Sequence, residues 1–309
     1  MATTTVKSRR RPAKASWDFE EGAAIAPGRT ILKALGGGSR YEVFLVWDER
    51  LFALMVAKVI RPDQVEDSHA LRELQREAEL LEQLAHPVIV RGFDAVVDGP
   101  HPHLLIEHLE GPTLRSLIKR GGPLPLQQLL PLALHVAAAI HYLAQEKVVH
   151  LDVKPDNIVM GVPSRLIDMS VARSFERAAR LSGAVGTDAY MAPEQCDTDT
   201  YAGRVGAPAD VWGLGASVFH ALTGKVPFPR PRGASRESED PVERWPQLVD
   251  DPRPFPKRVP PELADALLAT LRKDPGQRPS AAELATALEP LVAALPKKLA
   301  FGRRGTRGR

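Results

Sequence analysis

The sequence predicts an α+β fold in which a small part rich in β-strands is followed by a larger part rich in helices. Three observations support this. Residues 30–60 contain three apolar runs with strand character, and a Gly-rich turn separates the first two. Residues 69–85 repeat apolar side chains every three or four positions, which is typical of one amphipathic helix. Beyond residue 129 the apolar segments have helical length, so we expect two lobes with a cleft between them.

The small part is predicted to contain four strands and one helix. Its strands are expected at Thr30–Leu35, Tyr41–Trp47, Leu51–Ile60 and Leu104–Glu107. The helix is expected at His69–Ala85, because Leu71, Leu74, Ala78 and Leu81 fall on one face.

The larger part is predicted to be mainly helical. Helices are expected at Leu129–Glu146, Ala209–Thr223, Pro261–Leu271 and Ala281–Leu295, and short strands at Asn157–Met160 and Arg165–Ile167. Pro261 suits a first helical turn, and Gly224 suits a helix end. The segment Phe228–Val259 is predicted to be mostly loop.

Composition restricts the class of protein. The 309 residues are 44% hydrophobic and 26% charged, which is typical of a globular chain. The single cysteine, Cys196, excludes an intramolecular disulfide, and we therefore expect a cytoplasmic protein. The most apolar segment, Leu129–Ala144, contains His135 and His141, so we expect a buried helix and no transmembrane segment.

The formal charge of +3 is unevenly distributed. Basic residues gather near the two ends of the sequence, at Lys7, Arg9, Arg10, Arg11, Lys14, Lys297, Lys298, Arg303, Arg304, Arg307 and Arg309. We interpret residues 1–27 as a flexible basic leader and residues 296–309 as a flexible basic tail. A contact with nucleic acid or with an anionic membrane is the weaker interpretation of these charges.

Two features of the small part suit a bound phosphate. Gly36, Gly37 and Gly38 lie between two strands, where glycines allow the backbone to approach phosphate closely, although such a hairpin is more often only a turn. Lys58 lies within an apolar strand, where its charge needs a partner. Glu77 lies beside the apolar face of the predicted helix and is the candidate partner.

The segment His150-Leu151-Asp152-Val153-Lys154-Pro155-Asp156-Asn157, followed by a strand, a turn, a strand and then Asp168, resembles the catalytic loop of eukaryotic-like protein kinases. Further motifs of that family occur in the family's order. They are Gly186-Thr187, Ala192-Pro193-Glu194, the segment Asp210–Gly215, and Arg278-Pro279. The resemblance is strongest to the bacterial Ser/Thr branch.

The resemblance implies a bilobal protein-kinase fold over residues 28–295. Its N-lobe would comprise residues 28–107 and contain one key helix, and the hinge and helical C-lobe would comprise residues 108–295. It also implies ATP as the phosphate donor and protein Ser/Thr side chains as the acceptors.

The resemblance assigns roles to individual residues. Asp152 would orient the substrate hydroxyl and accept its proton, and Lys154 would contact the γ-phosphate. Asn157 and Asp168 would hold Mg²⁺, with Mn²⁺ as an alternative. The implied nucleotide-binding residues are Leu35, Gly36, Gly37, Gly38, Val43, Ala57, Lys58, Glu77, Glu107, Leu109, Asn157 and Asp168. Glu194 would pair with Arg278, and Asp210 would support the catalytic loop.

Three positions depart from the family pattern. Tyr41 replaces the third glycine of the phosphate loop, where its ring could cap the phosphates and could also lower the affinity for nucleotide. Leu151 replaces the arginine that binds a phosphate on the activation segment, so we expect activity that does not depend strongly on phosphorylation of that segment. Met169-Ser170 replaces Phe-Gly, which predicts a less mobile metal-binding loop.

We therefore predict a Ser/Thr protein kinase. The alternative is a pseudokinase that binds nucleotide as a scaffold or sensor, and a small-molecule phosphotransferase fits less well because such enzymes lack the Ala192-Pro193-Glu194 segment. A homodimer or a regulatory partner remains open, as does the physiological substrate.

Overall fold

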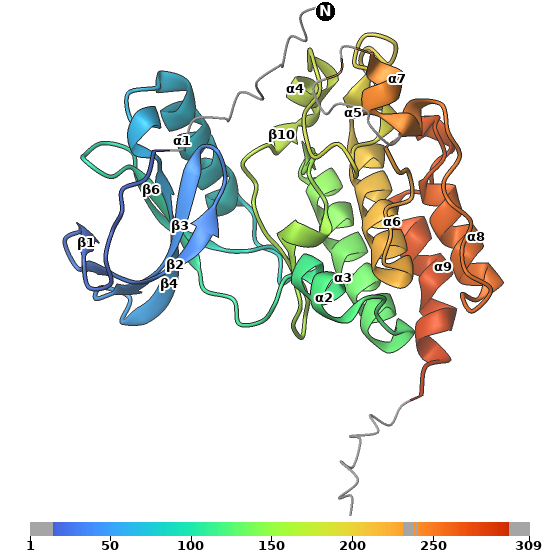
Figure 1. The fold of residues 1–309 in the computed structure, drawn as a ribbon, viewed down its shortest axis with the longest axis horizontal. Helices are drawn as coiled ribbons and strands as arrows, with labels where there is room; N and C mark the ends of the chain where they lie inside the picture. Colours follow the sequence, from blue (N-terminus) through green and yellow to red (C-terminus); the bar gives the residue numbers. More distant parts are fainter. Residues whose placement is uncertain (1–14, 231–237, 239, 297–309) are drawn as a thin grey trace, which may run out of the picture. The chain divides into compact units, whose positions relative to one another are not determined.

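The computed structural model describes residues 15–296 except 231–237 and 239, and these residues form two compact units (Figure 1). The small unit contains residues 15–84 and Arg91–His108. The large unit contains Ala85–Val90 and the described residues from Leu109 onward.

The small unit is built on a six-stranded sheet in which every neighbouring pair is antiparallel, with the order β1-β2-β3-β4-β6-β5. The strands are β1 (Ala24–Ala26), β2 (Arg29–Gly37), β3 (Tyr41–Asp48), β4 (Ala53–Ile60), β5 (Gly92–Val96) and β6 (His103–Glu107). β1 and β5 were not predicted from the sequence. Strand β4 is central, and its last six residues are buried, which places Lys58 in the interior of the unit.

Helix α1 (Ser68–Gln83) lies against β5 and β6 in the small unit. It begins where the carboxylate of Asp67 accepts a hydrogen bond from the His69 backbone N–H at 2.8 Å. Its buried face includes Leu74, Glu77 and Leu81. The predicted helix is therefore present, and its inward face carries Glu77.

The predicted leader is wrong for residues 15–27, because these residues pack on the sheet. The Trp17 indole N–H donates to the carbonyl of Ile60 at 2.7 Å, and its backbone N–H donates to the Glu42 carboxylate at 3.0 Å. The Trp17 ring lies 5.7 Å from the Phe19 ring and 4.6 Å from the His101 ring, measured between centroids. Residues 1–14 and 297–309, which carry the basic clusters, lie outside the described residues.

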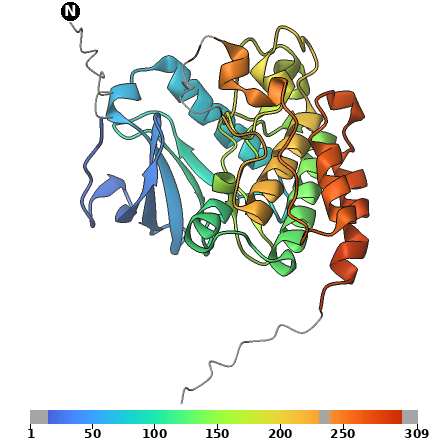
Figure 2. The same ribbon diagram turned by 45° about the vertical axis from the view of Figure 1, so that its right-hand side comes forward.

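The large unit is mainly helical, as predicted (Figure 2). Its helices are α2 (Leu114–Gly121), α3 (Leu126–Gln145), α4 (Phe175–Ala179), α5 (Pro193–Cys196), α6 (Ala207–Thr223), α7 (Pro241–Arg244), α8 (Pro261–Thr270) and α9 (Ala281–Ala293). α3 packs against α6 and α9, and α6 also packs against α8. α6 ends at Gly224, whose φ of +74° is left-handed, as expected for a glycine that terminates a helix.

Helix α3 is the one helix among the described residues that is long and apolar enough to cross a membrane. Nine of its side chains are buried, and it contacts α6 and α9. These contacts are those of the core helix that the sequence predicted.

Four two-residue strands position the loops of the large unit. They are β7 (Val148–Val149), β8 (Ile158–Val159), β9 (Arg165–Leu166) and β10 (Arg173–Ser174), paired antiparallel as β7–β10 and β8–β9. The segment His150–Asn157 therefore connects β7 to β8, and Asp168 follows β9 closely. The predicted loop Phe228–Val259 contains α7, which the sequence analysis missed.

Candidate active site

In the small unit, Lys58 of β4 and Glu77 of α1 form a buried ion pair. The Lys58 ammonium donates to both carboxylate oxygens, at 2.9 Å to Oε1 and 2.8 Å to Oε2. A buried ammonium is costly without a partner, and Glu77 provides two acceptors for it. The pairing expected from the helical pattern is therefore present.

Tyr41 does not have the position that we expected. Its ring is buried in β3, and the Lys58 ammonium lies 4.6 Å from the ring centroid. The side chain therefore contacts the lysine inside the unit and does not extend from an exposed loop as a cap. A cation next to an aromatic face is favourable, so Tyr41 also stabilises the charge of Lys58.

The Gly-rich hairpin contains glycines of two kinds. Gly37 has φ +153°, and a Cβ at this position would lie 2.4 Å from the carbonyl oxygen of Tyr41, so the hairpin itself requires glycine. A Cβ at Gly36 or Gly38 would meet no atom within 4 Å. The backbone at these two positions faces open space, which suits a group that approaches the amides closely, such as a phosphate.

The other predicted nucleotide-binding residues of the small unit lie on its strands. Val43 is half-buried opposite Lys58, Ala57 is fully buried, and Leu35 is exposed. Glu107 ends β6, and its Oε1 accepts a hydrogen bond from the Arg91 backbone N–H at 2.8 Å. Leu109 belongs to the large unit and is half-buried.

In the large unit, Asp210 of α6 holds the start of the loop after β7. Its buried carboxylate accepts hydrogen bonds from the backbone N–H of His150 at 2.7 Å and of Leu151 at 2.8 Å. Burial raises the pKa of Asp210 to about 6, and these two donors act in the opposite direction. Asp210 therefore has the supporting position that the resemblance implied.

The imidazole of His150 fixes the next part of the loop. Its Nδ1 accepts from the Asp152 backbone N–H at 3.2 Å, and its Nε2 lies 3.2 Å from the carbonyl oxygen of Ile167, to which it donates. This fully buried ring links the loop that carries Asp152 to the segment that carries Asp168.

Asp152 is the centre of a polar cluster. The Lys154 ammonium donates to its Oδ2 at 2.6 Å, and the Thr187 hydroxyl donates to its Oδ1 at 2.7 Å. The same lysine also donates to the Thr187 oxygen at 2.7 Å. Asp152 is thus held at both oxygens, and a carboxylate fixed in this way is suited to orient a hydroxyl group.

Asn157 and Asp168 offer oxygen ligands for a metal ion. The Asn157 side-chain Nδ2 donates to Asp152 Oδ2 at 3.2 Å and to the Asp152 carbonyl at 3.0 Å, which leaves Oδ1 as the acceptor atom. The Asn157 carbonyl accepts from the Ile167 backbone N–H at 2.9 Å, so Asp168 is tied closely to this residue. Hard oxygen ligands of this kind fit Mg²⁺, which usually takes one or two protein groups together with substrate phosphates.

The backbone of Asp168 is in the left-handed region, with φ +68°. Ser170, where the family has glycine, is not among the residues with positive φ, so its side chain causes no strain of that kind here. Met169 is buried, as expected for an apolar residue in this position.

The sequence analysis missed one polar side chain next to the site. The Gln195 amide donates to the carbonyl oxygens of Leu151 and Val185, both at 2.8 Å, and so joins the loop after β7 to the segment before α5. Its position directly after Ala192-Pro193-Glu194 was the available signal.

Comparison with known proteins identifies the family. The sequence model of one protein family, the protein kinase domain, matches residues 29–287, which is most of the chain. The chain belongs to the protein kinase family. The predicted α+β protein-kinase fold is thereby confirmed, as is the resemblance on which the residue roles rest.

This kinase domain is similar to several bacterial proteins. It is 31% identical over 257 residues to the serine/threonine-protein kinase PknB of Mycobacterium leprae, covering 79% of this chain and 39% of the relative. It is 28% identical over 270 residues to the serine/threonine-protein kinase PrkC of Bacillus subtilis, covering 85% of this chain and 40% of the relative. The kinase domain thus corresponds to about two fifths of the length of these relatives.

Proposed function

We propose that this kinase domain transfers the γ-phosphate of ATP to Ser or Thr hydroxyls of protein substrates. The observation that carries the proposal is the Asp152 cluster, in which Lys154 and the Thr187 hydroxyl hold the two carboxylate oxygens. Asp152 would receive the proton of the attacking hydroxyl, and Lys154 would neutralise charge on the transferred phosphoryl group. The names of the relatives support Ser/Thr as the acceptor class.

The other residues would bind the nucleotide and its metal. Lys58, held by Glu77, would contact the α- and β-phosphates, while the amides near Gly36 and Gly38 would approach the phosphates. Asn157 and Asp168 would hold Mg²⁺, or Mn²⁺ in its place. When bound, the metal neutralises charge on the phosphates.

A phosphorylation assay tests the proposal. The protein is incubated with radiolabelled ATP, Mg²⁺ or Mn²⁺ and a generic protein substrate, and the labelled residues are identified. We expect label on Ser or Thr that falls at least about 100-fold in Asp152→Asn and in Lys58→Met. The matched control is Asp265→Asn, which makes the same change at an exposed site on α8 and keeps the activity.

The rival interpretation is the pseudokinase, in which the same fold binds nucleotide without transfer. Bound nucleotide measured by calorimetry, with no label under either metal, would establish that interpretation. Label that persists in Asp152→Asn would reject the role assigned to Asp152.

A further inference from the structure

A pocket of about 430 Å³ lies beside Thr187 in the large unit. Its lining includes five charged residues from separate segments: Arg115 of α2, Asp156 of the catalytic loop, Asp188, Arg230, and Arg244 of α7. Arginines outnumber aspartates in this lining. The pocket therefore has a positive balance of charge although it is lined by carboxylates as well.

The negative charge of Asp188 is already paired with two arginines of the same pocket. Its carboxylate is 2.8 Å from Arg230 Nη2 and 3.5 Å from Arg244 Nη2, and it accepts a further hydrogen bond from the Trp245 indole N–H at 3.1 Å. Three donors on one carboxylate leave little negative charge for a ligand cation.

The charge of Arg115 is not paired in this way. Among the residues that the structure describes, no carboxylate lies within ion-pair distance of its guanidinium, and the side chain is exposed at the pocket. Tyr190, whose hydroxyl lies 2.6 Å from His220 Nδ1, also lines the pocket, and its hydroxyl is within hydrogen-bond reach of Arg115. Arg115 thus offers an uncompensated guanidinium, which suits a carboxylate or a phosphate.

The pocket is joined to the catalytic cluster through Thr187. Thr187 is in the pocket lining, and its hydroxyl donates to Asp152 Oδ1 at 2.7 Å. A peptide whose hydroxyl reaches Asp152 advances at most about 3.6 Å per residue. The pocket is therefore within reach of a side chain close to the phosphoacceptor.

We infer, on the basis of the proposed function, that this pocket selects protein substrates with an acidic side chain within about three residues of the phosphoacceptor, and that Arg115 binds that side chain. The acidic group is a carboxylate or a phosphate, since a guanidinium binds both in the same two-pronged way. The negative charge of Asp156 in the lining repels such a ligand. A preference of the kinase for substrates with basic residues would indicate that Asp156 outweighs Arg115.

A set of synthetic peptides tests the inference. Each peptide has one central Ser and carries Ala, Lys, Asp, Glu or phosphoserine at one flanking position. We expect kcat/KM to be about threefold to tenfold higher for the acidic peptides than for the Ala peptide at one position or more. A higher value for phosphoserine than for Asp and Glu identifies phosphate as the ligand, whereas equal values identify the carboxylate, and either result supports the pocket.

Variants assign the preference to Arg115. In Arg115→Gln the ratio of acidic to Ala peptides falls towards one through a rise in KM for the acidic peptides. In Arg115→Glu the preference moves to the Lys peptides. Arg120→Gln removes the same charge from an exposed site on α2 that does not line the pocket, and it keeps the wild-type ratio.

The outcomes separate the two proposals. A wild-type protein that phosphorylates peptides but prefers Ala or Lys overturns this inference alone. An acidic preference that persists unchanged in both Arg115 variants also overturns it. A wild-type protein that labels neither the peptides nor a generic protein substrate overturns the proposed function together with the inference.

Discussion

The guanidinium of Arg278 and the carboxylate of Glu194 form a two-pronged ion pair in which both side chains are fully buried. The distances are 2.6 Å between Nη1 and Oε1 and 2.7 Å between Nη2 and Oε2. Arg278 also donates to the backbone carbonyls of Arg272, Pro208 and Lys273, at 2.7, 3.0 and 3.1 Å. The pair therefore connects α5 to the first turn of α6 and to the segment between α8 and α9.

Because the pair has no contact with solvent, the loss of one partner leaves the other charge buried. We expect Glu194→Gln to lower the free energy of unfolding by about 3–5 kcal/mol. Urea denaturation followed by circular dichroism measures this change. Glu289→Gln makes the same substitution at an exposed site on α9 and should change stability by less than about 0.5 kcal/mol. Equal losses in the two variants would show that the buried ion pair contributes no more to the free energy of unfolding than an exposed glutamate does.

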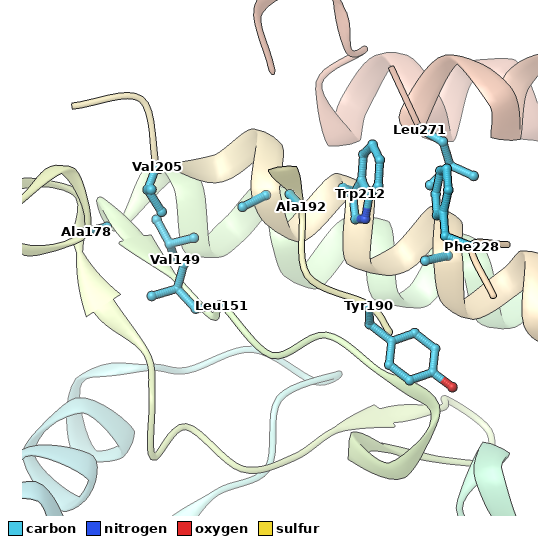
Figure 3. Close-up of a cluster of buried hydrophobic side chains, with 11 residues drawn as sticks. Val149, Leu151, Ala178, Tyr190, Ala192, Val205, Trp212, Phe228 and Leu271 are labelled. Atoms are coloured by element: carbon cyan, nitrogen blue, oxygen red, sulfur yellow. The ribbon is translucent and has the colours of Figure 1, made fainter. Parts of the chain in front are cut away.

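Leu151 leads to a prediction about regulation. Its side chain is 2% exposed and packs in a cluster with Val149, Ala178 and Ala192 (Figure 3). Leucine has no charged group to bind a phosphate on the activation segment. We therefore expect phosphatase treatment to leave the rate of substrate phosphorylation within about twofold of that of the untreated protein.

Mass spectrometry must show that the treatment removed the phosphate groups. Ser174→Ala and Ser182→Ala are the matched variants, since both serines are exposed and lie between Asp168 and Glu194, where the family resemblance places the activation segment. A loss of activity of about tenfold or more after treatment would mean that another cation replaces the missing arginine.

The sequence predicted those parts of the site that follow from local periodicity or from the family motifs. Glu77 lies on the inward face of α1 because the apolar repeat of that helix determines which side is buried. The packing of Trp17 was not predictable in this way, because its partners Glu42 and Ile60 lie 25 and 43 residues along the chain. The charged pocket was missed for the same reason, since the topology brings its residues together from separate segments.

Trp17 should be important for the stability of the small unit. Trp17→Ala removes the stacking on Phe19, the edge contact with His101 and the hydrogen bond to Ile60. Since the side chain is half-buried, we expect a loss of about 2 kcal/mol, less than for a fully buried tryptophan. Thermal unfolding of the whole protein provides the measurement. Phe52→Ala removes an aromatic ring that is 81% exposed and serves as the control, and a melting temperature equal to that of this control would contradict the predicted role.

Because of His220, we expect the stability of the protein to depend on pH. Burial lowers its pKa from 6.5 to about 4, and the charge of Arg115 acts in the same direction while that of Asp156 opposes it. The Tyr190 hydroxyl lies 2.6 Å from Nδ1, within hydrogen-bond distance.

The sign of the effect follows from the direction of this shift. The folded state binds fewer protons than the unfolded state between pH 6.5 and about 4, so the stabilisation is complete above pH 6.5 and is lost as the pH falls through that range. We expect wild type to lose about 2 kcal/mol more than His220→Gln between pH 7 and pH 4.5, after allowance for solvent screening. Urea denaturation at a series of pH values measures the difference. His141→Gln, at an exposed site on α3, should follow wild type, and a His220→Gln curve parallel to wild type would rule out His220 as the group responsible.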